Sequence, residues 1–348
     1  MTVAKVNPTW HRLRALGYLL GRTPLTVPYF YSSELQKGIK QAIDSRSYDR
    51  IFIYCSSMAQ YVENISRIPT IMDLVDVDSD KWMQYAAFSR FPKSALYRRE
   101  GSCLREYELS VCAKATCTVV TTEREAEIVR RLSERIRVHV IPNGVDTAYF
   151  SPEAVTPQPS APTIIFTGDM SYYPNVQAVT YFAQNVFPLI SQKIPDARFL
   201  IVGRNPARSV QALAKIKNVE VTGFVPDVRP YLAQSRLSVA PFSIAAGIQN
   251  KILEAMACEI PVVATSRAVQ GLTQGVAGAV SIANEATEMA EKIVHLLMDQ
   301  EFARRTGVAG RQQVMLEYNW TQALEKLLRL VENPFSMDLL PSVSDRNV

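Results

Sequence analysis

The chain has 348 residues, of which 47% are hydrophobic and 20% charged, so it can bury the cores of two domains and is not an intrinsically disordered protein. A net charge of +5 is only mildly basic, and without a nucleic-acid-binding motif it argues against DNA or RNA as a partner. No apolar run approaches the roughly 18–20 residues that span a bilayer. The 5 cysteines are scattered, which predicts reduced thiols, a cytoplasmic protein and no structural zinc site.

Short apolar runs alternate with helical patterns along the chain. In chain order, the predicted strands are residues 50–55, 70–76, 117–122 and 137–141, followed by 162–168, 197–203, 219–224, 237–242, 260–265 and 279–283. This alternation predicts parallel sheets with ligands at the carboxyl ends of the strands. Residues 143–162 are rich in proline and lack periodicity, which is typical of a linker. The predicted fold class is α/β, with two Rossmann-like, doubly wound domains that face each other across a cleft.

Two segments of the first half combine basic and apolar residues. Residues 10–22 set Leu13, Leu16 and Leu20 against arginines, and residues 90–105 add further basic side chains. Basic amphipathic segments favour anionic lipid surfaces, so we expect peripheral attachment to the inner face of the plasma membrane. The alternative is an ordinary basic surface in contact with water.

Two aspartates follow the predicted strand 70–76. Asp76 and Asp78 stand at its end in the sequence "DVDSD". An Asp-x-Asp pair of this kind can hold a divalent metal ion that in turn holds a diphosphate. The sequence therefore leaves a metal site open as an alternative at this position.

The segment "GIQNKILEAMACEIPVVAT", residues 247–265, places one cation and one anion in an apolar setting. Read as a helix that begins near Gly247, it puts Ile248 and Ile252 on a buried face and Lys251 and Glu254 together on another flank. The pair then forms either an i,i+3 salt bridge worth about 0.2–0.5 kcal/mol, or a site for a ligand with an anionic group and hydroxyl groups.

Several motifs resemble one enzyme family. "VIPNGVDTAYFSP", "LEAMACEIPVVAT" and "YNWTQALEKLLRLVE" resemble the retaining glycosyltransferases of family 4, or group 1, which have the GT-B fold. "DLVDVDSDKW", "FTGDMSYYPNV", "VPDVRPYLAQS" and "GIQNKILEAMA" resemble the sugar transferases of exosortase (PEP-CTERM) exopolysaccharide systems. The resemblance implies retaining, metal-independent transfer of a hexosyl group from a nucleotide diphosphate sugar to a glycan or lipid-linked acceptor, with no cofactor.

The resemblance also implies how the domains divide the work. Residues 1–145 would form the acceptor-side domain, joined by a returning C-terminal helix at 318–334, and residues 150–317 would bind the nucleotide sugar. About sixty N-terminal residues of the family pattern have no counterpart here, so a non-catalytic, donor-binding remnant is an alternative to an active enzyme. A nucleotide-sugar 2-epimerase on the same fold is the next alternative.

Carried over to this chain, the family pattern assigns individual roles. Glu254 matches the glutamate that contacts the ribose, but Ala246 replaces the family's sugar-contacting glutamate, and Asp169 and Pro174 stand where the family tends to carry an arginine and a lysine. Lys251 is therefore the candidate cation for the diphosphate, and Asp76 is the candidate group facing the acceptor or the transferred sugar. The predicted donor-binding residues are Gly168, Gly203, Arg204, Gly223, Phe224, Gly247, Ile248, Gln249 and Glu254. Each of the glycines that ends a strand can also be a plain turn residue.

Overall fold

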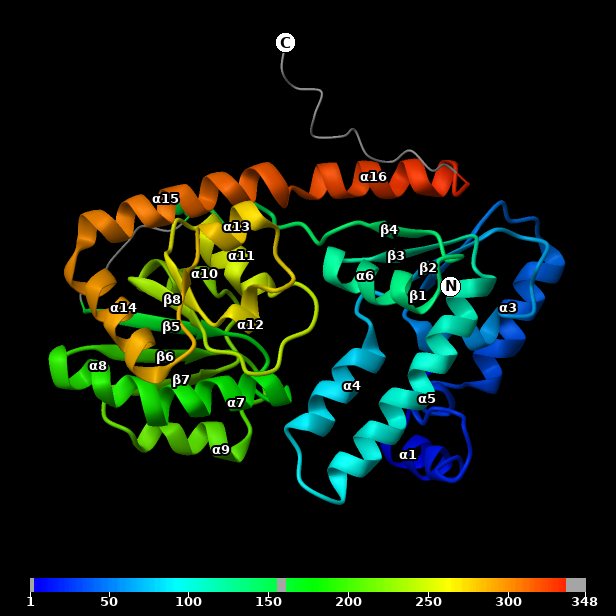
Figure 1. The fold of residues 1–348 in the computed structure, drawn as a ribbon, viewed down its shortest axis with the longest axis horizontal. Helices are drawn as coiled ribbons and strands as arrows, with labels where there is room; N and C mark the ends of the chain where they lie inside the picture. The colour runs from blue at the N-terminus through cyan, green and yellow to red at the C-terminus, as the bar shows by residue number, and fades with distance from the viewer. Residues whose placement is uncertain (1–2, 155–160, 336–348) are drawn as a thin grey trace, which may run out of the picture. The chain divides into compact units, whose positions relative to one another are not determined.

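The computed structural model describes residues 3–154 and 161–335, and the chain divides into two compact units (Figure 1). The first domain comprises Met1–Pro142 and Leu324–Val348, and the second domain comprises Asn143–Ala323. Helix α16 (Trp320–Glu332) begins in the second domain and ends in the first. Residues 318–323, which the sequence analysis assigns to the first domain, thus lie in the second. Residues 155–160 of the predicted linker lie outside the described residues.

The first domain is built on a four-stranded parallel sheet. Its strands follow in the order β1 (Ile51–Tyr54), β2 (Thr70–Asp73), β3 (Cys117–Val120) and β4 (Val138–Val140). Because successive side chains in a strand point to opposite faces, Met72 and Val120 belong to one apolar core, whereas Ile71 and Val119 pack on the other face with Leu330 of α16. Helix α16 is thereby fixed to this sheet by apolar burial.

Helices surround this sheet, and two charged residues of one of them anchor the N-terminal segment. Arg99 donates to the carbonyls of Tyr18, Gly21 and Thr23, and the neighbouring Glu100 accepts from the backbone of residues 25–26. The helices are α1 (Pro8–Leu16), α2 (Thr26–Tyr29), α3 (Ser33–Ser45), the 3-10 helix η1 (Ser56–Tyr61), α4 (Asp78–Ala87), α5 (Lys93–Lys114) and α6 (Glu123–Leu132).

The second domain contains a six-stranded parallel sheet in the order β10-β9-β8-β5-β6-β7. The first strand of the domain lies in the middle, and the chain then builds outward on one side before returning to the other. The reversal falls between β5 and β8, which is the topological switch point where open α/β sheets bind ligands. The strands are β5 (Thr163–Thr167), β6 (Arg198–Val202), β7 (Val219–Gly223), β8 (Leu237–Ala240), β9 (Val262–Ala264) and β10 (Ser281–Ile282).

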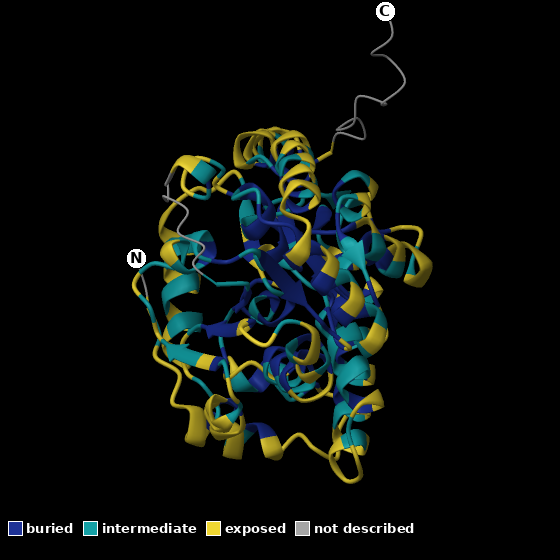
Figure 2. Ribbon diagram, turned by 90° about the vertical axis from the view of Figure 1, so that its left-hand side faces the viewer, coloured by how far each residue is buried: buried dark blue, intermediate teal, exposed yellow. Residues whose placement is uncertain are grey.

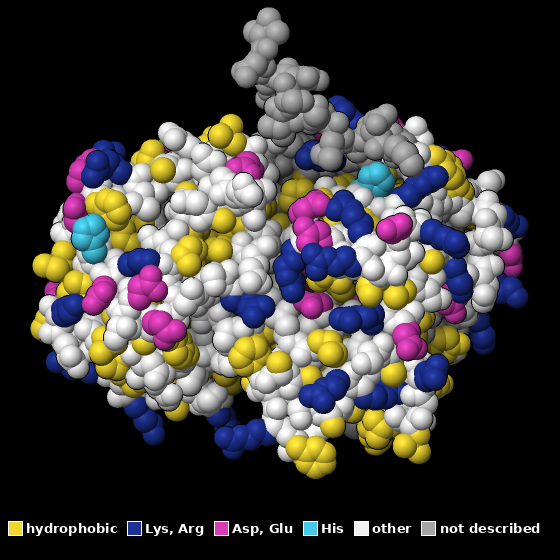
Figure 3. All heavy atoms as spheres, in the orientation of Figure 1, with side chains coloured by type: hydrophobic (Ala, Val, Ile, Leu, Met, Phe, Trp, Pro, Cys, Tyr) yellow, Lys and Arg dark blue, Asp and Glu magenta, His cyan; other side chains and the backbone are white. Residues whose placement is uncertain are grey.

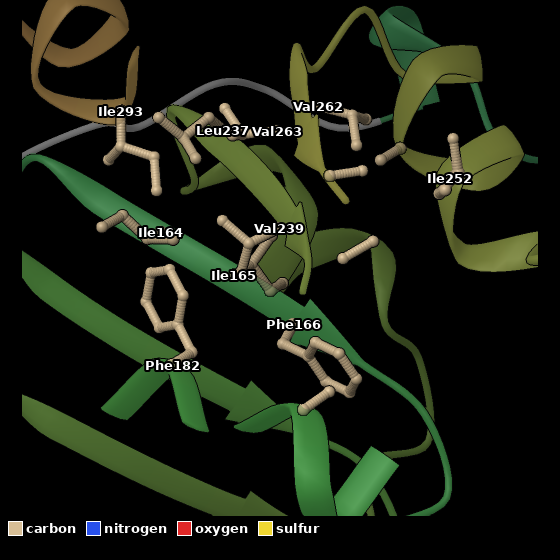
Figure 4. Packing of buried hydrophobic residues seen from close by; sticks show 14 of the residues in the cluster. Ile164, Ile165, Phe166, Phe182, Leu237, Val239, Ile252, Val262, Val263 and Ile293 are labelled. Atoms are coloured by element: carbon tan, nitrogen blue, oxygen red, sulfur yellow. The ribbon is translucent and has the colours of Figure 1, made fainter. Parts of the chain in front are cut away.

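The central strands of this sheet are buried on both faces, as parallel strands with helices on each side require. Every residue of β5 is buried, and buried strands appear in dark blue at the centre of Figure 2. Ile164, Ile165 and Phe166 pack among side chains from β8, β9 and the covering helices (Figure 4). The helices are η2 (Pro152–Ala154), α7 (Tyr173–Tyr181), the π-helix η3 (Phe182–Val186), α8 (Phe187–Lys193), α9 (Arg208–Gln211), η4 (Ala212–Lys215), α10 (Arg229–Ala233), α11 (Asn250–Ala257), α12 (Ser266–Val269), α13 (Gln274–Gly278), α14 (Ala286–Met298) and α15 (Gln300–Glu317).

The five cysteines, all within the described residues, carry free thiols. Among the described helices, none combines the length and the apolar composition needed to cross a bilayer.

Candidate functional site

The amine of Lys251 lies at the switch point of the second domain. Its Nζ donates to Asn175 Oδ1 at 2.8 Å and lies 3.9 Å from the ring centroid of Phe166 and 4.7 Å from that of Phe242. Phe166 belongs to β5 and Phe242 follows β8, so the two strands on either side of the reversal both contribute to the site. Aromatic faces attract an ammonium group, which offsets part of its loss of hydration.

These surroundings change the acidity of the amine. The residue as a whole is partly exposed, but its ammonium end is enclosed by the two rings, Asn175 and Gly168. Burial therefore lowers the pKa of Lys251 to about 7, against a usual value of 10.5, although the nearby Glu254 opposes this shift. Near neutral pH the amine exchanges readily between its charged and neutral forms.

Glu254 lies on the same flank of α11 but does not form an ion pair with Lys251. Among the described residues no N–O pair within 4.0 Å joins the two, and no side chain or backbone group donates a hydrogen bond to the Glu254 carboxylate. Burial raises the pKa of Glu254, and Lys251 counteracts that rise. The simple i,i+3 salt bridge is therefore wrong as an account of this pair, and the carboxylate keeps its hydrogen-bonding capacity.

Three of the predicted glycines form a row along the strand ends. Gly168 N donates to Val202 O at 3.0 Å, and Gly203 N donates to Gly223 O at 3.2 Å. A Cβ on Gly203 would lie 1.6 Å from Gly168 O, so this glycine is required by the close approach of two chain segments. A Cβ on Gly168 would lie 2.8 Å from Asn175 Nδ2 and 3.1 Å from Lys251 Nζ. The space over Gly168 is thus used by Lys251 and Asn175.

The start of α11 differs from the sequence expectation. The helix begins at Asn250, and Gln249 occupies the N-cap position without a capping hydrogen bond from its side chain. Gly247, at a φ of 60°, and Ile248, which is buried in the domain core, belong to the preceding loop. The predicted helix start at Gly247 is therefore three residues too early, because no capping side chain marks the observed start at Asn250.

Arg204 and Phe224, which are among the predicted donor-binding residues, are exposed side chains that follow β6 and β7. Arg204 Nε donates to Asp169 Oδ2 at 2.9 Å, and Asp169 also accepts from the backbone and hydroxyl of Ser171. These hydrogen bonds lower the pKa of Asp169 to about 2. The aspartate that replaces a family cation is thus paired with an arginine from the next strand end.

In the first domain, Asp76 lies beyond the carboxyl end of β2, next to Val75, whose φ of 63° is unusual for a β-branched residue. Burial raises the pKa of Asp76, Lys81 lowers it, and Asp78 raises it further. Asp78 is itself ion-paired with Lys81. Within the described residues, no group of three or more His, Cys, Asp and Glu side chains is arranged to hold a metal ion.

Asn175 is the site residue that the sequence reasoning missed. It lies in the first turn of α7 and is buried, its Nδ2 donates to Asp169 O at 2.9 Å, and its Oδ1 accepts from Lys251. Asparagine is rarely buried without a polar partner, but that signal is visible only once its burial is known. By contrast, a cavity of about 270 Å³ between α10, α14 and α15 contains none of the predicted site residues.

Comparisons with known proteins find a family model and curated relatives that match part of this chain. Residues 161–299 match the family model described as "Glycosyl transferases group 1". Over 223 residues the chain is 29% identical to the alpha-maltose-1-phosphate synthase of Mycolicibacterium smegmatis, and the match covers 56% of each protein, so the chain spans about half of that relative.

Solved structures share the architecture of nearly the whole chain. Sucrose-phosphate synthase from Thermosynechococcus elongatus has a TM-score of 0.66 at 18% identity, with 87% of this chain and 77% of that chain covered. Anabaena HepE, solved in complex with UDP and glucose, has a TM-score of 0.65 at 16% identity, with 86% and 81% covered. The chain therefore has the GT-B fold, and its residues 161–299 match the group 1 glycosyltransferase family model.

Proposed function

We propose that the chain is a retaining glycosyltransferase that moves a hexosyl group from a nucleotide diphosphate sugar to a glycan or lipid-linked acceptor in exopolysaccharide synthesis of the exosortase-associated type. The observation that carries the proposal is the arrangement on α11. An amine and a carboxylate lie one turn apart at the switch point and are not paired with each other. Such a pair suits a ligand with a diphosphate and a ribose.

The proposed chemistry assigns separate tasks to the two side chains. Departure of the nucleoside diphosphate develops negative charge, and a preorganised donor at that position lowers the barrier. Lys251 would supply this donor, assisted by the backbone N–H groups at the start of α11. Glu254, which has acceptor capacity to spare, would accept hydrogen bonds from the two ribose hydroxyls.

The remaining parts of the proposal concern the acceptor and the metal. We assign the acceptor hydroxyl, or the sugar in transit, to Asp76, whose carboxylate accepts no hydrogen bond from the other described residues. The departing phosphate can take the acceptor proton, so the proposed reaction requires neither a histidine base nor a metal ion. The complex of HepE with UDP and glucose supports a nucleotide-sugar donor at this fold.

The test is direct binding of the donor. We would screen nucleotide diphosphate sugars for thermal stabilisation of the full chain, and then measure the affinity of the best one by calorimetry for Glu254→Gln. Hydrogen bonds to a charged group contribute about 1.5–3 kcal/mol, so the affinity should fall by roughly ten- to a hundredfold. Glu291→Gln, the same change on the exposed side of α14, is the control and should leave the affinity unchanged.

Two outcomes would count against the proposal. An unchanged affinity in folded Glu254→Gln would remove the ribose role of the carboxylate. A chain that binds the donor tightly but neither transfers nor hydrolyses the sugar would be a donor-binding remnant instead of an enzyme.

A further inference from the structure

A cavity of about 620 Å³ lies within the first domain, between α1, α2, α4 and the first half of α5. This volume is in the range of small-molecule sites, roughly 300–1,000 Å³. Its walls are mostly apolar and aromatic, and include Leu16, Leu25, Phe30, Trp82, Leu96 and Tyr97. The aromatic side chains contact one another, since the ring centroids of Trp82 and Tyr97 lie 5.3 Å apart.

The carboxylates in the walls already have partners. Glu100 accepts from Leu25 N at 2.7 Å, from Thr26 N at 2.9 Å and from Thr26 Oγ1 at 2.8 Å. Asp78 is ion-paired with Lys81. A sugar would find few free hydrogen-bonding groups in these carboxylates, whereas a hydrocarbon chain needs none.

The mouth of the cavity is apolar as well. Leu16, Phe30 and Leu96 line the cavity and also reach the surface, with exposed fractions of 52%, 38% and 38%. Exposed apolar side chains that continue into a cavity mark a binding site more often than chance surface exposure. These three side chains offer an apolar molecule a continuous apolar path into the cavity.

A positive charge at the cavity favours an occupant that has an anionic end. Arg12 lines the cavity, is exposed, and makes no hydrogen bond or ion pair with the other described residues. Its guanidinium group has the geometry to bind a phosphate in a bidentate manner. Lys81 and Asp78, also in the wall, are the charged groups that flank Asp76.

We propose that this cavity binds the single hydrocarbon chain of a lipid phosphate, with the phosphate at Arg12. The inference rests on the proposed function, because it identifies the acceptor as lipid-linked and brings its polar end towards the charged groups beside Asp76. Trp82 and Tyr97 provide the contact surface for the chain, and the partly exposed Leu16 and Leu96 extend that surface to the outside of the domain.

The test uses farnesyl monophosphate, below the concentration at which it forms micelles, as the probe. The chain has 3 tryptophans, so the double variant Trp10→Phe/Trp320→Phe leaves Trp82 as the only one. We expect a saturable change in Trp82 fluorescence. In this background Arg12→Ala should weaken binding of farnesyl phosphate about tenfold, in line with the loss of a charge-assisted hydrogen bond, and should leave binding of farnesol unchanged.

Three leucine variants distinguish binding in the cavity from nonspecific hydrophobic adsorption. Leu16→Asp and Leu96→Asp introduce a charge at the mouth and should abolish saturable binding, whereas Leu13→Asp, on the same helix but outside the cavity, should retain it. The melting temperature of each variant checks that it is folded. Absence of a saturable signal in the folded parent, equal loss with Leu13→Asp, or full displacement by inorganic phosphate would overturn the proposal.

Donor binding, measured on the same preparations, separates the two proposals. Donor binding without farnesyl phosphate binding would remove the lipid site alone. Farnesyl phosphate binding without donor binding would remove the glycosyltransferase and leave a lipid-binding cavity.

Discussion

Lys251 is held in place by neutral groups instead of a counter-ion. Asn175 accepts one hydrogen bond from it, and the rings of Phe166 and Phe242 cover other sides of the ammonium group. A salt bridge with Glu254 would have neutralised both groups before any ligand arrived. The present arrangement leaves an amine whose charged form is poorly hydrated, which strengthens the interaction of that form with an incoming anion.

We predict that Lys251→Met lowers kcat far more than it lowers stability. Methionine preserves the helix propensity and most of the stem volume, and losing the hydrogen bond to the buried Asn175 costs about 1–3 kcal/mol. Losing one preorganised donor at a developing oxyanion costs about 10²–10³ in rate. The measurements are kcat and the urea midpoint. Lys292→Met, which breaks an ion pair with Glu288 on α14, is the control and should affect neither value strongly.

We also predict that donor binding takes up a proton above pH 7. The pKa of Lys251 is about 7 in the free protein, and a diphosphate nearby favours the charged amine. Affinity should therefore fall as the pH rises from about 7 to 9, and calorimetry in buffers of different ionisation enthalpy should detect the proton. The effect should vanish in Lys251→Met. If wild type and variant show the same pH dependence, the amine does not face the diphosphate.

The sign of the stability effect follows from the same shift. Between pH 7 and about 10 the unfolded chain binds a proton at this lysine that the folded chain does not. The contribution of Lys251 to the free energy of unfolding therefore rises with pH across this window, and it falls as the pH drops towards 7.

At the level of elements, the sequence predicts the positions of strands, because burial requires their residues to be apolar. Each of the ten apolar runs contains a strand of the structure, because buried parallel strands consist almost wholly of apolar residues. The start of α11 cannot be located from the sequence, because Gly247 to Gln249 carry no capping signal. The contact of Asn175 with Lys251 joins residues 76 positions apart, and local patterns do not predict such contacts.

The close approach of Gly203 to Gly168 leaves no space for a larger residue at position 203. Gly203→Ala places a Cβ 1.6 Å from Gly168 O, so the backbone must move, and overpacking of this kind costs about 1–3 kcal/mol or more. Gly278→Ala, at the end of α13, is the control because nothing lies within 4 Å of the Cβ that alanine would add there. We expect a clearly lower urea midpoint for the first variant only. Equal midpoints would show that the strand ends can separate at little cost.

Over the whole molecule, the likeness in fold to known proteins extends further along the chain than the likeness in sequence. Structural likeness covers 87% of the chain, whereas the family model matches only residues 161–299, inside the second domain. The first domain therefore preserves an architecture with fewer recognisable sequence features. Its parallel sheet could be anticipated from apolar runs. Its cavity and anchored N-terminal segment instead depend on contacts of α5 with residues 18–26, which periodicity does not reveal.

The first domain also presents basic and apolar side chains together on one surface. Its lower edge in Figure 1 is formed by α1 and the turn between α4 and α5, and Figure 3 shows apolar and basic side chains together there. Leu13 and Phe91 are 60% and 83% exposed. Arg12, Arg90 and Lys93 are also exposed, whereas Arg99, counted in the basic segment 90–105, is committed to backbone carbonyls.

We therefore predict that the chain binds vesicles containing anionic lipid and binds purely zwitterionic vesicles much more weakly. Each basic residue near an anionic surface contributes about 1 kcal/mol, an effect that salt screens, and inserted apolar side chains add to it. In co-sedimentation, Leu13→Asp and Phe91→Asp should each reduce the bound fraction, because a carboxylate would have to enter the interface. Leu316→Asp, at a site 66% exposed on α15 of the second domain, makes the same change away from this surface and should bind like wild type. Binding that is indifferent to anionic lipid and salt would leave the basic residues as an ordinary hydrated face. An equal loss with Leu316→Asp would show that the adsorption is not specific to the first domain.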